Sequence, residues 1–213
     1  NPFKTIKRAI AMIFPDEEHP ITLNLANGNY NPANGEIFPI VVQNFVSFAG
    51  EDKYSTVIDA QETERVMRIE NTLENKIENL TISGGKAIFV NAMLEGFETG
   101  GGGIYIARSG PIIFDVFFTS NIAINTQGAA LSINYGGDET PKIINSDFTD
   151  NIGESTVYVN TATGSFYNCN IYELFSNPKK GNIVINGMLN YLGGAIHIYD
   201  QTLKGIGEDG PDT

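Results

Sequence analysis

The side chains best suited to binding a ligand are aromatic and basic residues that recur at similar intervals along the chain. Aromatic rings pack against the apolar faces of sugars, and Arg and His donate hydrogen bonds to sugar hydroxyls. Most of these residues take outward positions on one repeated strand type, and Ser132 and Val184 complete the row. The predicted binding residues are Arg68, Tyr105, Arg108, Tyr158 and His197. The alternative is that Tyr is simply favourable on an exposed strand and that the row binds nothing.

Acid and base residues for catalysis are sparse. A polysaccharide lyase needs a base to take the proton next to a carboxylate, and a glycoside hydrolase needs two carboxylates about 5–10 Å apart. The row holds no acid, and the second strand type offers only Asp147 outward, with Asp150 and Glu154 in the following turn. We therefore predict no catalytic residues. An enzyme, in the first place a lyase, would require Arg68, Arg108 or a Lys to converge with acids in one groove.

No metal or cofactor is predicted. His19 and His197 lie too far apart in the repeat to share a metal ion, and Cys169 is the only cysteine, which excludes an internal disulfide. Ca²⁺ would have to bind in the acidic loops at 95–98 or 136–139, yet neither loop has the dense alternation of ligands that calcium loops show. Cys169 falls at an inward strand position and is interpreted as an inert buried thiol.

Composition limits the classes of partner. The 213 residues suit one repetitive all-β domain, and the formal net charge of −12 argues against nucleic acid and against anionic lipid. No run of 18 apolar residues occurs, so no transmembrane segment is predicted. The partner that these limits leave is a polysaccharide or a cell-surface glycan.

A repeat of about 26 residues positions the binding row. The first strand type recurs at steps of 27, 26 and 26 residues, through Ile104, Leu131, Val157 and Ile183. The next similar strand follows only 13 residues later, at Ile196. Either the last coil is short, or one of these two strands belongs to another face.

A second strand type lies between these strands and shows two columns of equivalent residues. One column is polar and marks a turn, and the other is apolar and points inward. The polar column is Asn79, Asp115, Asn145 and Asn168, and the apolar column is Ile82, Phe118, Phe148 and Ile171. Stacked parallel strands would place each residue about 4.8 Å from its equivalent in the next coil. Asn at such a turn accepts a left-handed backbone and can bond to the next Asn, forming a ladder.

These features predict an all-β fold, a right-handed parallel β-helix with an N-terminal capping α-helix. The helix is expected over residues 3–14, with Asn1 as its N-cap. Its apolar stripe is Phe3, Ile6, Ile10 and Ile13. A single domain is expected over 1–213, with coils over 21–200 and a tail over 201–213. The tail lacks a recognisable cap, so further coils or a partner chain are expected to cover the open end.

Short motifs connect the chain to a known family. They are Gly193-Gly194-Ala195-Ile196, its variant Gly101-Gly102-Gly103-Ile104, Phe118-Thr119-Ser120-Asn121 and Phe148-Thr149-Asp150-Asn151. They resemble the GGA(I/L/V) and FxxN repeats of polymorphic outer membrane proteins and related bacterial surface β-helix proteins. The start of the chain is similar to that of pectate-lyase-like β-helix domains. The resemblance implies a secreted or surface-attached bacterial protein, and it implies a fold far more strongly than an activity.

Three functions are compatible with these observations. The prediction is a non-catalytic adhesin or extracellular glycan-binding module that uses an exposed parallel sheet. The first alternative is a polysaccharide lyase or other carbohydrate-active enzyme on the same face. The second alternative is a structural spacer without a ligand.

Overall fold

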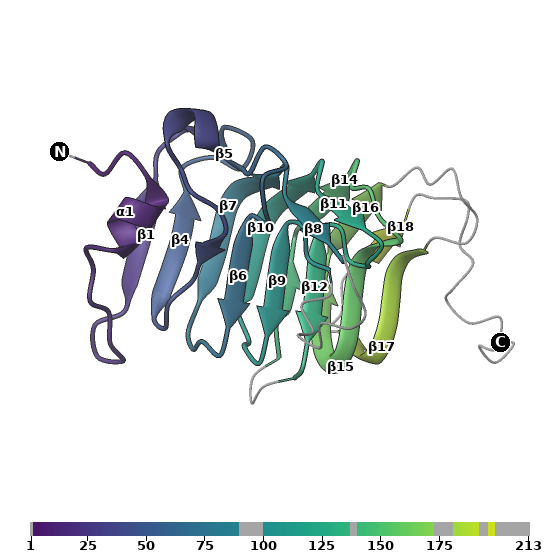
Figure 1. Cartoon of the computed structure of the whole chain (residues 1–213). Helices are drawn as coiled ribbons and strands as arrows, with labels where there is room; N and C mark the ends of the chain where they lie inside the picture. The colour runs from purple at the N-terminus through teal and green to yellow at the C-terminus, as the bar shows by residue number, and fades with distance from the viewer. Residues whose placement is uncertain (1, 90–99, 137–139, 173–180, 192–195, 199–213) are drawn as a thin grey trace, which may run out of the picture.

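The computed structural model describes residues 2–89, 100–136, 140–172, 181–191 and 196–198. Its strands stack side by side along one axis, from β1 (Ile21–Leu25) near the N-terminus to β17 (Gly181–Tyr191) near the other end (Figure 1). The paired strands are parallel, and the chain winds around the axis as the predicted right-handed β-helix.

The coils form three faces. Face 1 consists of β1, β4 (Val46–Gly50), the first half of β7 (Lys76–Ser83), the first half of β10 (Ile112–Thr119), β13 (Lys142–Ile144) and the ends of β15 (Ser155–Tyr167) and β17. Face 2 consists of β2 (Gly28–Tyr30), β5 (Thr56–Asp59), the second halves of β7 and β10, β14 (Asp147–Thr149), β16 (Cys169–Tyr172) and β18 (Ile196–Ile198). Face 3 consists of β3 (Ile40–Val41), β6 (Met67–Glu70), β9 (Ile104–Ala107), β12 (Leu131–Asn134) and the starts of β15 and β17. A small sheet of β8 (Lys86–Ile88) and β11 (Ile122–Ile124) follows face 2, and a 3-10 helix, η1 (Pro32–Asn34), precedes β3.

The strand register confirms the predicted repeat. On face 3, Leu131 pairs with Ile104 and with Val157, and Val157 pairs with Ile183. Ile196 instead pairs with Cys169 on face 2. The short step of 13 residues therefore arises because β18 belongs to another face.

Apolar columns fill the interior of the coils. The predicted column from Ile82 to Ile171 is in register and fully buried. Within it the rings of Phe118 and Phe148 stack with centroids 4.7 Å apart and planes only 2° apart. Stacking in one orientation follows from the parallel register, because equivalent residues share the same rotamer and environment.

The N-terminal helix is shorter than predicted. Helix α1 covers Ile6–Ile10, and Thr5 rather than Asn1 is its N-cap, with Thr5 Oγ1 accepting a hydrogen bond from the Arg8 N–H. Glu36 accepts the N–H of Ile6 at 2.6 Å, which fixes the first turn where a helix lacks its own acceptors. Phe3 is 51% exposed, whereas Ile6 and Ile10 belong to the core. No helix in the described ranges is long and apolar enough to cross a membrane.

Two columns of Asn side chains tie the turns together. The polar column from Asn79 to Asn168 has φ values of 50–54°, and Asn168 Nδ2 donates to Asn145 Oδ1 at 2.9 Å, as expected of an Asn ladder. A second pair is fully enclosed, with Asn121 Nδ2 donating to Asn151 Oδ1 at 2.9 Å. These last two Asn residues end the two FxxN motifs, so the motif marks a buried polar ladder.

The Gly-rich run before β9 serves close contact between coils. Gly100 and Gly101 have φ values of +84° and +69°, which other residues rarely adopt. A Cβ on Gly103 would clash with the carbonyl oxygen of Ala130 in the next coil. The run is therefore a turn that requires small residues.

Truncation of a ring in the stacked Phe118–Phe148 column should destabilise the protein. We expect Phe148→Ala to lower the free energy of unfolding by about 3–5 kcal/mol, because it leaves a cavity between fixed neighbours. Ile152→Ala is the matched control, since Ile152 is 60% exposed, and it should change stability by less than about 0.5 kcal/mol. Urea unfolding of both variants measures the difference. Equal losses of unfolding free energy in the two variants would show that the stacked column does not stabilise the core.

Burial should suppress the reactivity of Cys169. The thiol is fully buried, and burial raises its pKa to about 11. At pH 8 we expect the native protein to react with a disulfide reagent about a hundredfold more slowly than the unfolded protein does, because little thiolate is present. Rapid labelling of the native protein would contradict this assignment.

Candidate functional site

The predicted row on face 3 is assembled in part. Arg68 lies beside Tyr105, Tyr105 beside Ser132, Ser132 beside Tyr158, and Tyr158 beside Val184. The sequence thus placed these positions correctly in one row across five strands. Whether the row binds a glycan stays a prediction.

The ring of Tyr105 is not exposed, which corrects one expectation. Tyr105 is only 2% exposed, and the Arg65 guanidinium lies 5.5 Å from the centre of its ring. Arg65 is held there by a hydrogen bond from its Nε to the Gly100 carbonyl at 3.0 Å. Arg68 forms an ion pair with Glu70 at 2.6 Å. Tyr105, in the middle of the row, is therefore buried, and the charge of Arg68 at the end of the row is neutralised by Glu70.

The other two predicted residues lie apart from this row. Arg108 is exposed just after β9, and its guanidinium lies 5.3 Å from the centre of the Tyr135 ring. His197 pairs with Asn170 in β16, so it belongs to face 2 and its placement in the face 3 row was wrong. The physical reason is the change of face between β17 and β18.

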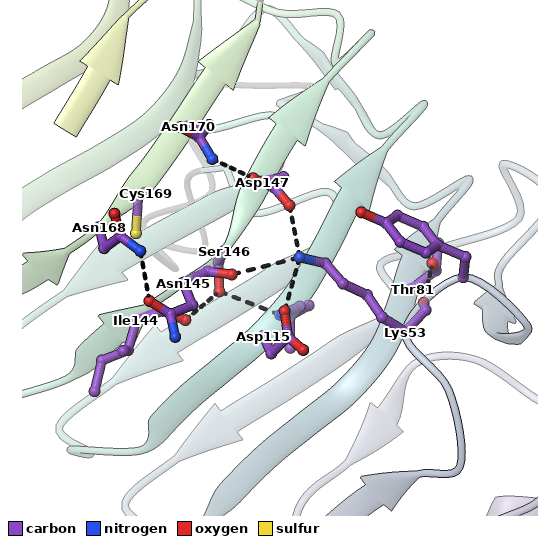
Figure 2. A network of polar contacts seen from close by, with 12 residues as sticks. Lys53, Thr81, Asp115, Ile144, Asn145, Ser146, Asp147, Asn168, Cys169 and Asn170 are labelled. Atoms are coloured by element: carbon purple, nitrogen blue, oxygen red, sulfur yellow. Dashed lines mark hydrogen bonds and ion pairs between the residues drawn. The ribbon is translucent and has the colours of Figure 1, made fainter. Parts of the chain in front are cut away.

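A buried lysine joins two carboxylates on face 2 (Figure 2). Lys53 lies in the turn after β4, where Asp52 Oδ1 accepts the N–H groups of Tyr54 and Ser55. Thr81 Oγ1 donates to the Lys53 carbonyl at 2.7 Å and holds this turn over β7. The Lys53 side chain, only 10% exposed, then extends along the axis toward later coils.

The ammonium group of Lys53 has three oxygen partners. Nζ lies 2.9 Å from Asp115 Oδ1, 2.6 Å from Asp147 Oδ2 and 3.4 Å from the Asn145 carbonyl oxygen. Asp147 Oδ1 accepts a further bond from Asn170 Nδ2 at 2.6 Å. An ammonium has three hydrogens, so all of its donors are used.

The network keeps Lys53 charged. Burial alone would lower the pKa of Lys53, but hydrogen bonds and charges from Asp147 and Asp115 outweigh it, and the pKa is raised. A lysine that is protonated at neutral pH cannot take a proton from a substrate there. Lys53 does converge with acids, as an enzyme would require. Here it forms ion pairs with Asp115 and Asp147 that join different coils, and we call these three residues the Lys53 strap.

Face 1 carries an open groove that the sequence did not predict. Its volume is about 600 Å³, and it is lined by Glu74, Asn75, Lys76, Gly110, Ile112, Thr140 and Lys142. Lys76, Ile112 and Lys142 are neighbours in register across β7, β10 and β13. The groove therefore follows the axis of the β-helix.

An apolar strip runs beside this groove. Phe114 pairs with Ile144, and Ile144 pairs with Tyr167, which is 39% exposed. We call these three residues the face 1 strip. Alternation along β10 places Ile112 and Phe114 outward and Ile113 inward. This alternation was visible in the sequence. Asp115, whose backbone is in the left-handed region, interrupts it at the corner between faces 1 and 2.

The described residues give no sign of a metal centre. Nowhere in the part of the chain that the structure describes do three His, Cys, Asp or Glu side chains come together to hold an ion. The acidic loop at 95–98 and residues 137–139 of the other loop lie outside the described residues.

Comparison with known proteins defines the family and the fold. A family model described as "Protein of unknown function (DUF1565)" matches residues 1–210. No curated protein matches the chain.

Solved pectin methylesterases share the architecture. The enzyme from Yersinia enterocolitica has a TM-score of 0.58 and 16% identity over 89% of this chain and 65% of its own. PemA from Erwinia chrysanthemi has a TM-score of 0.57, and a pectin methylesterase in complex with hexasaccharide VII has 0.61, both at 16% identity over 94% of this chain. The chain spans 63% of the length of these last two. Similarity at this identity shows a common β-helix fold.

The Lys53 strap should be a pH-dependent source of stability. We expect Lys53→Met to destabilise the protein by about 2 kcal/mol at pH 7, because two carboxylates lose a charged partner. The raised pKa of Lys53 means that this contribution is complete below the unfolded pKa of about 10.4 and disappears as pH rises through the folded value.

Thermal unfolding between pH 7 and 11.5 tests the strap. The difference between the wild type and Lys53→Met should be constant to about pH 10 and then shrink. Lys86→Met is the matched control, because Lys86 lies 3.6 Å from a Glu62 carboxylate that is 57% exposed. A Lys86 effect as large as the Lys53 effect would contradict the strap.

Proposed function

The chain belongs to the DUF1565 family, and from its site geometry we propose that it is a non-catalytic, extracellular glycan-binding module that uses face 1. The observation that carries this proposal is the face 1 strip, which lies in register beside a groove with polar walls. Sugar rings offer an apolar face and a rim of hydroxyls, so they match a strip and a polar groove side by side.

The spacing of the strip suits an extended chain. Phe114, Ile144 and Tyr167 come from successive coils, which parallel stacking sets about 4.8 Å apart. The strip therefore offers apolar contacts over about 10 Å along the axis. Since strands of a sheet hold these side chains, little conformational entropy is lost on binding.

Related structures support a saccharide ligand without assigning one. One of the similar structures is a pectin methylesterase in complex with a hexasaccharide. Arg68, Arg108 and Tyr158 on and beside face 3 stay the predicted second contact surface for a glycan. Adhesion to a cell-surface glycan is the biological role that this proposal favours.

The non-catalytic part of the proposal is supported by the way in which the charges are paired. Among the described outward residues on the strands of face 3, Glu70 is the one acid, and Arg68 neutralises it. Lys53 has no donor left and stays protonated. A lyase needs a base that can accept a proton, and neither group provides one.

Loss of the two rings of the face 1 strip should weaken glycan binding. We expect Phe114→Ala with Tyr167→Ala to weaken binding to an immobilised panel of plant and bacterial polysaccharides at least tenfold, because each ring contributes roughly 1 kcal/mol. Phe14→Ala is the control, since Phe14 is 90% exposed and lies at the N-terminal end of the chain.

Other outcomes would distinguish the alternatives. Release of methanol or of unsaturated products from the panel would show an esterase or a lyase and refute a non-catalytic module. No binding and no turnover by the wild type would refute glycan recognition and favour a structural spacer.

A further inference from the structure

The outward column that contains the face 1 strip continues toward the N-terminal coils. From it we infer that face 1 binds an extended glycan of about five sugar residues along the axis, with a second contact in a hollow over Ala49. This inference rests on the proposed glycan-binding function and adds the length of the ligand and its course over the surface. It is carried by the strand register, by the small side chain of Ala49 and by the polar groups around it.

The strand register joins Ala49 to the strip. Ala49 in β4 pairs with Glu78 in β7, and Glu78 pairs with Phe114, the first residue of the strip. β4, β7 and β10 lie side by side in this order (Figure 1). From Tyr167 to Ala49 the column takes four steps of about 4.8 Å, or about 19 Å in all. A sugar ring in an extended chain advances by about one such step, so about three rings cover the strip and about five reach Ala49.

The hollow over Ala49 has a size and a lining that suit a sugar ring. Its volume is about 340 Å³. Apolar groups of Leu25, Ala26 and Ala49 line it together with the polar side chains of Asn24 and Glu51. Ala49 carries only a methyl group, whereas Glu78 and Phe114, the next residues of the column, are large. An apolar floor beside a few polar groups is typical of saccharide sites.

The polar groups of the hollow can bond to sugar hydroxyls. The Asn24 side chain is exposed and forms no hydrogen bond with any residue that the structure describes, so its amide can both donate and accept. Glu51 Oε2 accepts the N–H of Asn27 at 3.1 Å, which holds the carboxylate in place. A carboxylate has several acceptor positions, so Glu51 can also accept a bond from a hydroxyl.

An ion pair lies between the strip and the hollow. Lys76 Nζ is 2.7 Å from Glu78 Oε2 and 5.4 Å from the centre of the Phe114 ring. Both partners of the pair belong to β7, so the Glu78 carboxylate is directed along its own strand toward Lys76. It can still accept a bond from a hydroxyl. The fourth ring of an extended glycan would therefore meet a polar contact, with an apolar contact on either side of it.

A series of oligosaccharides of increasing length tests this course. The probes are fragments of two to eight sugar residues, prepared by partial acid hydrolysis of the panel polysaccharide that the wild type binds most tightly. By calorimetry, we expect the affinity to rise roughly tenfold or more between three and five residues and to change less than about twofold beyond six. A plateau at three residues, or a rise that continues to eight, would overturn the inference and leave the proposed function standing. Absence of binding to every polysaccharide of the panel would overturn both.

Filling the hollow separates the second contact from the strip. We expect Ala49→Ile to lower the affinity for the five-residue fragment about fivefold, because the larger side chain takes the place of the fifth ring, and to leave the affinity for the three-residue fragment unchanged. Thr149→Ile is the matched control on face 2, and it should change neither affinity. Isoleucine is favourable in strands, so both variants should fold, and thermal unfolding checks this. An equal loss for the two fragments, no loss for either, or the same effect in the control would overturn the assignment of the hollow.

Discussion

Parallel, in-register stacking is the constraint on which the rest of this molecule depends. Each side chain lies above its own equivalent in the previous coil, so apolar side chains pack on apolar side chains and polar ones must satisfy the hydrogen bonds of their neighbours. The stacked rings of Phe118 and Phe148 and the enclosed pair of Asn121 and Asn151 are two results of the same rule. The outward surface follows it as well, since the face 1 strip is one such column that points to solvent.

The sequence predicts what repeats and misses what occurs once. Steps of 26–27 residues were sufficient to place Ile104, Leu131 and Val157 correctly, because an equivalent residue recurs in each coil. Burial of Tyr105 was not predictable in this way, since Arg65, which lies over its ring, comes from a turn and not from a repeated strand position. The helix was overestimated because an apolar stripe does not show that Glu36 fixes its first turn.

The candidate site shows the same division. Lys53 and Asp147 are 94 residues apart, and no periodic signal joins them. The one sign of this ion-pair network in the sequence was Asp115, which is an acid in a column otherwise filled by Asn. A carboxylate at such a position is stabilised by a cation nearby, and that cation is Lys53. The groove on face 1 depends on Asn75 and Thr140, which lie in turns of variable length and outside the regular strands.

The Lys53 strap changes how the coils depend on one another. In a solenoid, contacts join adjacent coils, and stability behaves as a chain of nearest-neighbour couplings in which one end can fray by itself. Lys53 leaves the second coil, is held by Thr81 over the third and reaches Asp115 and Asp147 in the fourth and fifth. Such a long-range coupling extends the cooperative unit over four coils, so this segment should open in hydrogen exchange as one block.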